Sequence, residues 1–183
     1  MNVPRIRRLG THELDPSEVR AIREIMTLAF GDDEEEAFTD ADWAHALGGV
    51  HVVVDVGGEI VSHAAVVERA LHIAERPVRT GYVEAVATRP SRQGEGHGTR
   101  AMLDVNAIIR ERFELGALGT GSHHFYERLG WVTWQGPTFV RTREGLVRTR
   151  DEDGGILILE TRTSPPLDLS APLSCEWRPG DVW

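Results

Sequence analysis

Three glycines stand at every second position in the stretch SRQGEGHGTRAML, residues 91–103. A β-rich run precedes the stretch, and an apolar segment with helical spacing follows it. A strand, a glycine-rich loop and a helix in this order are typical of a phosphate site, because free backbone N–H groups and the positive end of the helix dipole converge there. Glycines also let a phosphate approach the backbone closely. The stretch therefore predicts a ligand that carries phosphate groups, with a flexible turn as the simpler alternative.

Known phosphate-binding patterns differ in how well they fit this loop. A P-loop needs Gly-Lys-Ser/Thr at its end, and the residues GHGTR do not supply it. A dinucleotide fingerprint needs G-x-G-x-x-G, whereas Gly94, Gly96 and Gly98 follow G-x-G-x-G. The pattern Gln/Arg-x-x-Gly-x-Gly/Ala fits at every fixed position when it starts at Gln93. We therefore favour this third pattern.

A carboxylate interrupts the apolar run just before the loop, because Glu84 lies within GYVEAVAT. Burying a carboxylate in a strand is costly unless the group is paired or functional. A carboxylate in such a place can take a proton from an ammonium group, directly or through water, so that the amine can attack an acyl group. A satisfied salt bridge explains the residue equally well.

The overall composition limits the class of partner. A length of 183 residues suits one domain with a complete hydrophobic core. The formal net charge of −9 disfavours nucleic acid and favours a cationic small molecule, although acidity also serves solubility. The single cysteine, Cys175, excludes an internal disulfide and a cysteine-rich metal site, and no metal is expected. Without a signal peptide or a long apolar run, we expect a cytoplasmic protein that does not bind a membrane.

Strands and helices alternate along the first half of the chain. We expect a strand at 3–9, then a helix in DPSEVRAIREIMTLAF with Asp15 as N-cap and Pro16 in the first turn. A second, short helix should run through Trp43, and β-rich runs around Gly57-Gly58 predict a hairpin. The apolar face of the first helix should contain Val19, Ile22, Met26 and Ala29.

The second half continues the alternation. After the glycine loop a helix should bury one face, made of Met102, Leu103, Val105, Ile108, Ile109 and Phe113. The segment LGALGTG predicts a short strand and loop, and SHHFYERLGW a short helix that ends at Gly130. Further β-rich segments are WVTW, TFVRT, GGILILE and LSCEW. The order β-α-α-β-β-β-α-β-α-β with a β tail predicts a mixed α/β (α+β) domain.

The loop pattern, the strand before it and the FYERLGW segment resemble the acetyl-CoA site of the GNAT N-acetyltransferase superfamily. This resemblance implies a single GNAT-like domain over 1–183, with a mixed, mostly antiparallel central sheet flanked by helices. It implies that strand pairing opens around Glu84–Val86, where the acyl-pantetheine arm adds like a strand, and that Tyr126 acts as general acid beside Glu84 as base. A packed aromatic is the structural alternative for Tyr126. The cofactor-binding residues it implies are Val86, Ala87, Gln93, Gly94, Gly96, His97, Gly98 and Thr99.

A more specific resemblance covers nearly the whole chain. It is to the aminoglycoside 2′-N-acetyltransferases, and it rests on DWAHALGGVHVVV, HAAVVERALH, GYVEAVA, LGAL, RLGWVTWQGPT, TRDEDGG and CEWRPGDVW. It implies a homodimeric enzyme that acetylates the 2′-amino group of gentamicin, tobramycin or kanamycin B with acetyl-CoA. An acetyltransferase for a polyamine or a cell-envelope amine, and a non-catalytic module that binds coenzyme A or a drug, remain as alternatives.

The same resemblance implies that carboxylates hold the ammonium groups of the antibiotic, with help from the tail 165–183. The substrate-binding residues are then Glu84, Asp32, Asp33, Glu36, Gly119, Thr120, Glu152, Asp181 and Trp183. Two segments depart from the family. The stretch GDDEEEAFTDADW is lengthened, which leaves open which of Asp32–Glu36 contacts substrate. The loop after LGAL is shortened, and Gly119 stands where the family has a serine, so that Thr120 or Ser122 can replace it.

Overall fold

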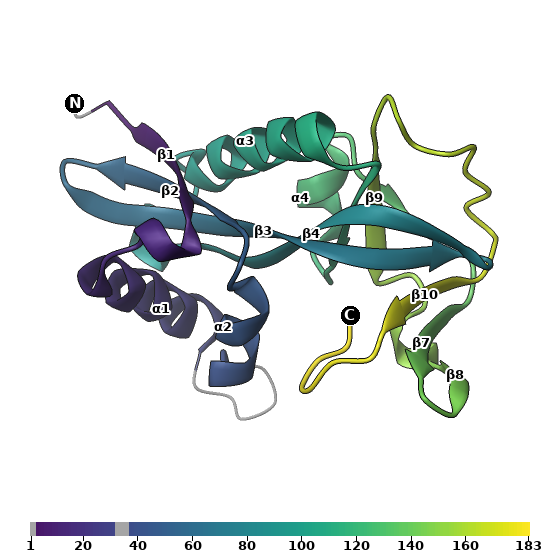
Figure 1. Ribbon diagram of the computed structural model, residues 1–183. Helices are drawn as coiled ribbons and strands as arrows, with labels where there is room; N and C mark the ends of the chain where they lie inside the picture. The colour runs from purple at the N-terminus through teal and green to yellow at the C-terminus, as the bar shows by residue number, and fades with distance from the viewer. Residues whose placement is uncertain (1–2, 32–36) are drawn as a thin grey trace. The chain divides into compact units, whose positions relative to one another are not determined.

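The computed structural model describes residues 3–31 and 37–183 (Figure 1). Asp32, Asp33 and Glu36 therefore lie outside the described residues. The chain divides into two compact units, and each is described by itself below. Unit 1 contains Met1–Val67 and Val83–Val105, and unit 2 contains Glu68–Tyr82 and Asn106–Trp183.

Unit 1 combines antiparallel strands with helices. Strands β1 and β2 pair with Arg5 opposite Asp55, and β2 pairs with β3 so that Val53 lies opposite His63. The strand order is β1-β2-β3-β4. The elements of unit 1 are β1 (Arg5–Gly10), η1 (Thr11–Glu13), α1 (Pro16–Phe30), α2 (Asp40–Ala46), β2 (Val50–Val56), η2 (Pro90–Arg92) and parts of β3 (Glu59–Ile73), β4 (Arg76–Thr88) and α3 (His97–Arg112).

Helix α1 begins as its sequence predicts. The carboxylate of Asp15 accepts hydrogen bonds from the N–H groups of Ser17 and Glu18, and Pro16 occupies the first turn. The predicted apolar face is wrong at one position, because Ala29 is exposed whereas Ile25 is buried. The buried core on this face of the strands comprises Ile22, Ile25, Met26, Trp43, Ala46, Val53, Ile60, Ala65 and Ala87.

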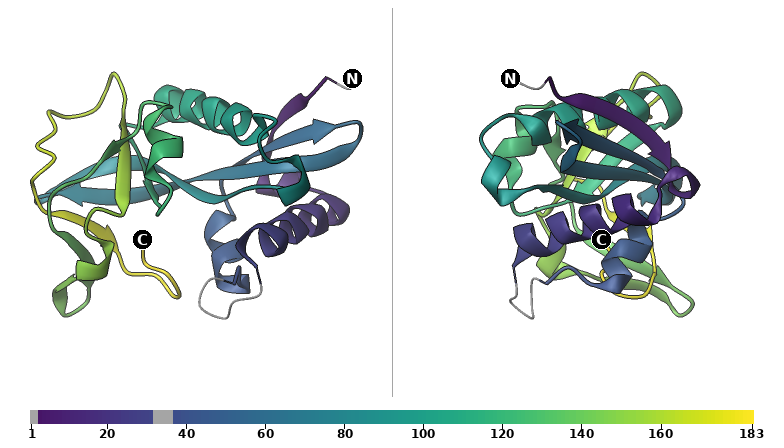
Figure 2. Two further views of the ribbon diagram at one scale, coloured as in Figure 1. Left: turned by 180° about the vertical axis from the view of Figure 1, so that it is seen from behind. Right: turned by 90° about the vertical axis from the view of Figure 1, so that its left-hand side faces the viewer.

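Unit 2 is a mixed, mostly antiparallel sheet, as predicted. Its strand order is β6-β9-β5-β4-β3-β10-β7-β8. The β4–β5 and β10–β7 pairs are parallel, and the β6–β9, β9–β5, β3–β10 and β7–β8 pairs are antiparallel. Figure 2 gives two further views of the ribbon. The pairing of β4 with β5 covers Thr80–Tyr82 of β4. The further elements are β5 (Leu115–Gly119), α4 (His123–Glu127), β6 (Val132–Thr133), β7 (Thr138–Thr142), β8 (Gly145–Arg148), η3 (Arg150–Glu152), β9 (Ile156–Glu160) and β10 (Leu173–Glu176).

The order of elements matches the sequence prediction, but two details differ. Strand β8 was not predicted; it pairs with β7 across a turn at Gly145, whose φ of 124° suits glycine. On α3, Met102, Val105, Ile108 and Ile109 are buried as predicted, whereas Leu103 is 54% exposed and does not widen the face. Among the helices of the described residues, none is long and apolar enough to cross a membrane.

Candidate functional site

The glycine loop of unit 1 connects η2 to α3 and is exposed at its tip. Gly94 and Gly96 adopt φ values of 82° and 78°, a conformation that residues with a side chain rarely adopt. A Cβ at Gly94 would meet no atom within 4 Å, so the space outside the backbone is open. Two causes therefore explain these glycines: the turn itself requires them, and their absent side chains leave the backbone accessible.

Free N–H groups converge where the loop enters α3. The N–H of Arg100 makes a helical bond to the carbonyl of Gly96 at 3.1 Å. The N–H groups of His97, Gly98 and Thr99 precede this bond, in the first turn, where an α-helix offers no carbonyl partner. With the positive end of the helix dipole they form an arrangement suited to an anionic group.

Side chains of the loop bind the loop itself. Arg92 donates two hydrogen bonds to the carboxylate of Glu95, at 2.9 and 2.8 Å, and His97 Nε2 lies 3.1 Å from the same carboxylate. These contacts, that of Arg92 first, lower the pKa of Glu95 to about 2. Gln93 donates to the carbonyl of Thr88 at 3.3 Å. The side chains of Gln93 and His97 thus hold the loop in shape.

The backbone of β4 is irregular next to Glu84. Ala85 has a φ of 50°, which is unfavourable for a residue with a Cβ, and its carbonyl accepts a hydrogen bond from His63 Nδ1 at 2.7 Å. Glu84 and Val86, on either side, are half-buried. The carbonyl of Ala87 accepts from Ser62 Oγ at 2.9 Å. The irregularity coincides with the segment where the sequence predicts that strand pairing opens.

Unit 2 gathers carboxylates around Glu152. Burial raises the pKa of Glu152, and the negative charges of Asp181 and Asp151 raise it further. Asp153 behaves differently, because its hydrogen bond with Arg148 lowers its pKa. Glu152 and Asp181 thus repel each other, and a bound cation would relieve that repulsion. This pair is where the structure best suits an ammonium group.

Two arginines hold the tail that carries Asp181. Arg69 Nη2 donates to the carbonyl of Val182 at 2.8 Å, and Arg178 donates to the carbonyls of Asp181 and Trp183 at 2.7 and 2.9 Å. Both guanidinium groups lie over the ring of Tyr82, at 4.6 and 5.6 Å from its centroid. Sequence reasoning missed this clamp, because its partners are far apart in the chain.

The other predicted substrate residues of unit 2 lie around this tail. Trp183 is only 4% exposed, and its indole N–H donates to Thr149 Oγ1 at 3.0 Å. A Cβ at Gly119 would lie 3.8 Å from the backbone carbon C of Trp183, an ordinary contact distance, so Gly119 lies next to the tail. Thr120 bonds through its N–H to the carbonyl of Gly155, and its hydroxyl accepts from Ser122 N at 2.9 Å. Unit 2 thus brings Gly119, Thr120, Glu152, Asp181 and Trp183 into one region.

Tyr126 is a packed aromatic of α4 with a phenol of altered acidity. Its side chain is 8% exposed, and its ring contacts those of Phe125 and Trp131 edge-on, at 4.9 and 6.4 Å between centroids. Burial raises the pKa of Tyr126 to about 12. The phenol therefore keeps its proton at neutral pH and can act as a donor.

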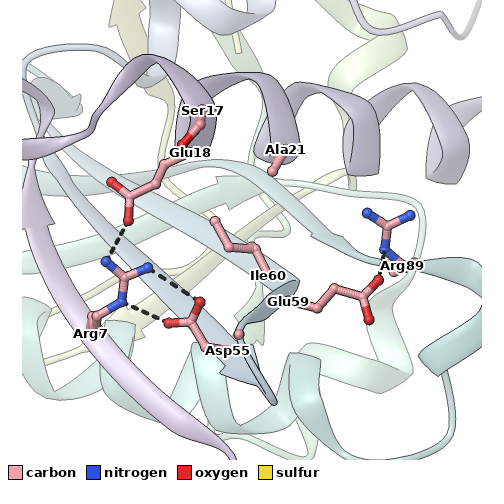
Figure 3. Close-up of a pocket in the computed structure, with 9 residues that line it drawn as sticks. Arg7, Ser17, Glu18, Ala21, Asp55, Glu59, Ile60 and Arg89 are labelled. Carbon is pink, nitrogen blue, oxygen red and sulfur yellow. Dashed lines mark hydrogen bonds and ion pairs between the residues drawn. The ribbon is translucent and has the colours of Figure 1, made fainter.

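A separate pocket of about 410 Å³ lies in unit 1 (Figure 3). Its charged residues bind one another: Arg7 contacts Asp55 at 2.7 Å, and Arg89 contacts Glu59 at 3.0 Å. None of the predicted site residues lines it. In the described ranges 3–31 and 37–183, no three histidine, cysteine or acidic side chains are grouped to hold a metal ion.

Comparisons with known proteins show the family to which the chain belongs. Residues 11–133 match the acetyltransferase (GNAT) domain. An aminoglycoside 2′-N-acetyltransferase from Mycolicibacterium fortuitum is 39% identical over 181 residues, which span 97% of this chain and 91% of the relative.

Solved structures share the fold at low sequence identity. A GNAT family acetyltransferase from Brucella melitensis, in complex with acetyl-CoA, superposes with a TM-score of 0.62 at 18% identity, over 94% of this chain and 96% of that one. The ribosomal-protein-S18-alanine N-acetyltransferase from Escherichia coli gives 0.59 at 15% identity, over 91% and 97%. The chain therefore belongs to the aminoglycoside 2′-N-acetyltransferase family of the GNAT acetyltransferases.

Proposed function

We propose that this protein transfers the acetyl group of acetyl-CoA to the 2′-amino group of aminoglycosides such as gentamicin, tobramycin and kanamycin B, and so confers resistance to them. The observation that carries the proposal is the similarity to the M. fortuitum enzyme along nearly the whole of both chains. The acidic pair Glu152 and Asp181 supports it, because an aminoglycoside carries several ammonium groups.

In this proposal the loop of unit 1 binds the diphosphate of acetyl-CoA. The main-chain N–H groups of Gly94–Thr99 supply the contacts, and Gln93 supports the loop from behind. Val86 and Ala87 contact the pantetheine arm, and the N–H of Val86 polarises the thioester carbonyl. The carbonyl of Ala87 accepts a hydrogen bond from Ser62 Oγ, which holds the backbone in place beside this segment.

The reaction is a direct transfer in a ternary complex. Glu84 accepts a proton from the 2′-ammonium group, directly or through water. The free amine then attacks the thioester carbon, the C–N bond forms, and the C–S bond breaks. The second amine proton is lost to the surroundings, and the sulfur leaves as a thiolate that is protonated to coenzyme A.

Tyr126 assists the leaving sulfur as a hydrogen-bond donor. Its pKa of about 12 lies above that of an ordinary thiol, roughly 8.5. Full proton transfer from the phenol to the thiolate is therefore uphill, whereas donation of a hydrogen bond stabilises the developing charge. The raised pKa of Tyr126 therefore favours hydrogen-bond donation over the general-acid role that the resemblance implies.

The antibiotic is held by the region around the tail of unit 2. Glu152 and Asp181 bind ammonium groups, Trp183 and Gly119 shape the surface beside them, and Thr120 lies at its border. We also retain the predictions that an acid of the segment 32–36 contacts substrate, that the tail 165–183 contributes to the pocket of one domain spanning 1–183, and that the enzyme is a homodimer. The cytoplasmic location stays a prediction.

A coupled assay tests the proposal. The protein is mixed with acetyl-CoA and either tobramycin or spermidine, and free thiol is followed over time. The proposal expects kcat/KM to favour tobramycin by at least about 100-fold, because carboxylates set for one polyamino sugar fit a flexible polyamine poorly. Equal efficiency would favour a polyamine acetyltransferase, and no thiol release with any 2′-amino aminoglycoside would reject the proposal.

Two substitutions separate an enzyme from a binding module. Glu84→Gln should lower kcat by roughly 100-fold or more because the base is lost, and Tyr126→Phe should lower it less, by about tenfold. Calorimetric titration with coenzyme A should give the wild-type affinity for both variants. A module that only sequesters the drug would protect cells equally well with either substitution.

A further inference from the structure

A chain of hydrogen bonds runs through the core of unit 1 to the irregular point of β4. Thr11 Oγ1 lies 2.8 Å from His51 Nε2, His51 Nδ1 lies 2.9 Å from His63 Nε2, and His63 Nδ1 lies 2.7 Å from the carbonyl oxygen of Ala85. At the outer end, the N–H of Gly48 donates to Thr11 Oγ1 at 2.8 Å. We call Thr11, His51 and His63 the histidine relay.

The last acceptor fixes the direction of every bond in the relay. A carbonyl oxygen only accepts, so His63 Nδ1 must carry a proton. Because burial favours neutral rings, His63 Nε2 then accepts from His51 Nδ1, and His51 Nε2 accepts from the hydroxyl of Thr11, which in turn accepts from Gly48 N. The two neutral imidazoles are therefore both protonated on Nδ1, and each polar atom of the relay has a partner.

The strands place the two histidines on one face. His51 lies opposite Ala65 on β3, and His63 lies opposite Val53 on β2, so the two are diagonal neighbours across the pair. Both are 0% exposed, and the ring of Trp43 from α2 lies 5.7 Å from that of His51 and 6.3 Å from that of His63. The surroundings thus exclude water from the relay.

Burial keeps both rings neutral. It lowers the pKa of His51 to about 4, and together with the neighbouring His51 it lowers the pKa of His63 to about 3. Polar side chains in such a core cost desolvation energy that aliphatic residues would avoid. Packing alone therefore does not explain why two histidines occupy these core positions. This points to a role for the hydrogen bond between His63 Nδ1 and the carbonyl of Ala85.

At the inner end of the relay, the strained residue Ala85 lies between Glu84 and Val86, the two residues with proposed roles in acetyl transfer. Ala85 has a φ of 50°, in the left-handed region that is unfavourable for a residue with a Cβ. Such strain persists only where the surroundings enforce it. Glu84 and Val86 flank Ala85 directly, so the peptide orientation at Ala85 determines where the carboxylate of Glu84 and the N–H of Val86 are directed.

We propose that the histidine relay is a positioning device: by holding the carbonyl of Ala85, His63 and, behind it, His51 and Thr11 maintain the irregular backbone at Ala85 that directs Glu84 and Val86. The inference rests on the proposed roles of those two residues in acetyl transfer. The histidines take no part in proton transfer to the substrate, because a carbonyl ends the relay and cannot pass a proton on.

Two substitutions of His63, the donor to the carbonyl of Ala85, test this role. His63→Phe keeps a ring but removes the donor, and should lower kcat by roughly 10- to 100-fold through misplacement of the reacting groups. His63→Asn, whose amide nitrogen replaces Nδ1, should stay within about fivefold of the wild type. Coenzyme A affinity, measured by calorimetry, should change little in either variant.

A second substitution, Ala85→Gly, should restore activity to the His63→Phe variant. In the His63→Phe background, Ala85→Gly should recover kcat by at least about fivefold, because glycine adopts the left-handed conformation without being held. Ala74 is the matched control: it is the other described non-glycine residue with positive φ, at 52°, and lies in the β3–β4 turn of unit 2. Ala74→Gly relieves similar strain and should leave kcat of His63→Phe unchanged.

The outcomes separate this inference from the proposed function. An inactive wild type would count against the proposed function alone. An active wild type in which His63→Phe keeps full kcat, or in which Ala85→Gly and Ala74→Gly rescue equally, would overturn the positioning role. Nitrogen-15 NMR of the wild type gives a readout that does not depend on activity or on variants that fold. Both histidines should be neutral and protonated on Nδ1 at pH 7, and the Nε2-protonated form of either ring would also overturn the relay.

Discussion

The glycine loop of unit 1 and the tail region of unit 2 are built in opposite ways. The loop presents backbone: Gly94 and Gly96 set the turn, and the first-turn N–H groups of α3 follow it, an arrangement that suits an anion. The tail region presents side chains, Glu152 and Asp181, and long-range contacts from Arg69 and Arg178 hold it. A backbone site depends on a short local pattern, whereas a side-chain site depends on tertiary packing, so the two should respond differently to substitution.

Removing the acidic pair of the tail region, Glu152 and Asp181, should have the largest effect, and the effect should be on KM for the antibiotic. The double substitution Glu152→Gln and Asp181→Asn should raise KM for tobramycin by roughly 100-fold, because two charge-assisted hydrogen bonds are lost. KM for acetyl-CoA should stay within about twofold in steady-state kinetics. Asp153→Asn is the control, since its hydrogen bond to Arg148 makes it structural. Equal increases of both KM values in the double variant would mean that the pair maintains the fold instead.

The loop should show the reverse selectivity. Gly94→Ala should raise the Kd of coenzyme A by about tenfold, because a methyl group stands where the ligand approaches and the positive φ is strained. Gly145→Ala is a matched control, because Gly145 also has positive φ and open space around its Cβ position. It should cost similar stability and leave coenzyme A affinity unchanged in calorimetry. If both variants bound coenzyme A as the wild type does, the loop would be only a turn.

The arginine clamp should have a smaller effect, confined to the antibiotic. Arg69→Met keeps much of the side-chain volume but loses the bonds to the carbonyls of Val182 and Glu176. We expect KM for tobramycin to rise about fivefold and the melting temperature to fall by a few degrees, as for a loss of about 1 kcal/mol. A fall in melting temperature without a change in KM would show that the clamp stabilises the tail without orienting it.

Acidification should produce the smallest effect, again in unit 2. The pKa of Glu152 is raised by burial and by Asp181, so Glu152 gains its proton at a higher pH than an exposed glutamate does. As the pH falls, the site loses negative charge and KM for tobramycin should rise two- to threefold before ordinary glutamates titrate. The Glu152→Gln variant should lack this rise. A rise of the same size in that variant would assign the titration to another group.

The local features of the fold were predictable from the sequence. Asp15 and Pro16 predicted the start of α1, Gly57-Gly58 the β2–β3 turn, and the spacing of Met102, Val105 and Ile109 the buried face of α3. Each of these features depends on residues that are close in the sequence: a helix cap, a glycine turn, or apolar residues at helical spacing. The burial of Ile25 in place of Ala29, and the strand β8, depend on what packs beside them, which periodicity does not contain.

The supporting contacts of the site were not predictable in the same way. Glu84 was selected as a carboxylate within an apolar run, and Glu152 and Asp181 were selected by resemblance. The clamp, however, joins Arg69 to Val182, and the relay joins Thr11 to His51 and His63. These partners meet only through strand register and tail placement. The available signal was two histidines within apolar β-rich runs, where a buried polar residue requires a partner.

The central claim, acetylation at one defined nitrogen, is tested most directly by the product formed from two related kanamycins. Kanamycin B carries a 2′-amino group, and its 2′-hydroxyl counterpart kanamycin A differs at that position alone. If the enzyme acetylates the 2′-amino group, mass spectrometry and NMR will find one acetyl group on the 2′-nitrogen of kanamycin B and no acetylated kanamycin A. Acetylation of both compounds, or of kanamycin B at another amine, would contradict it.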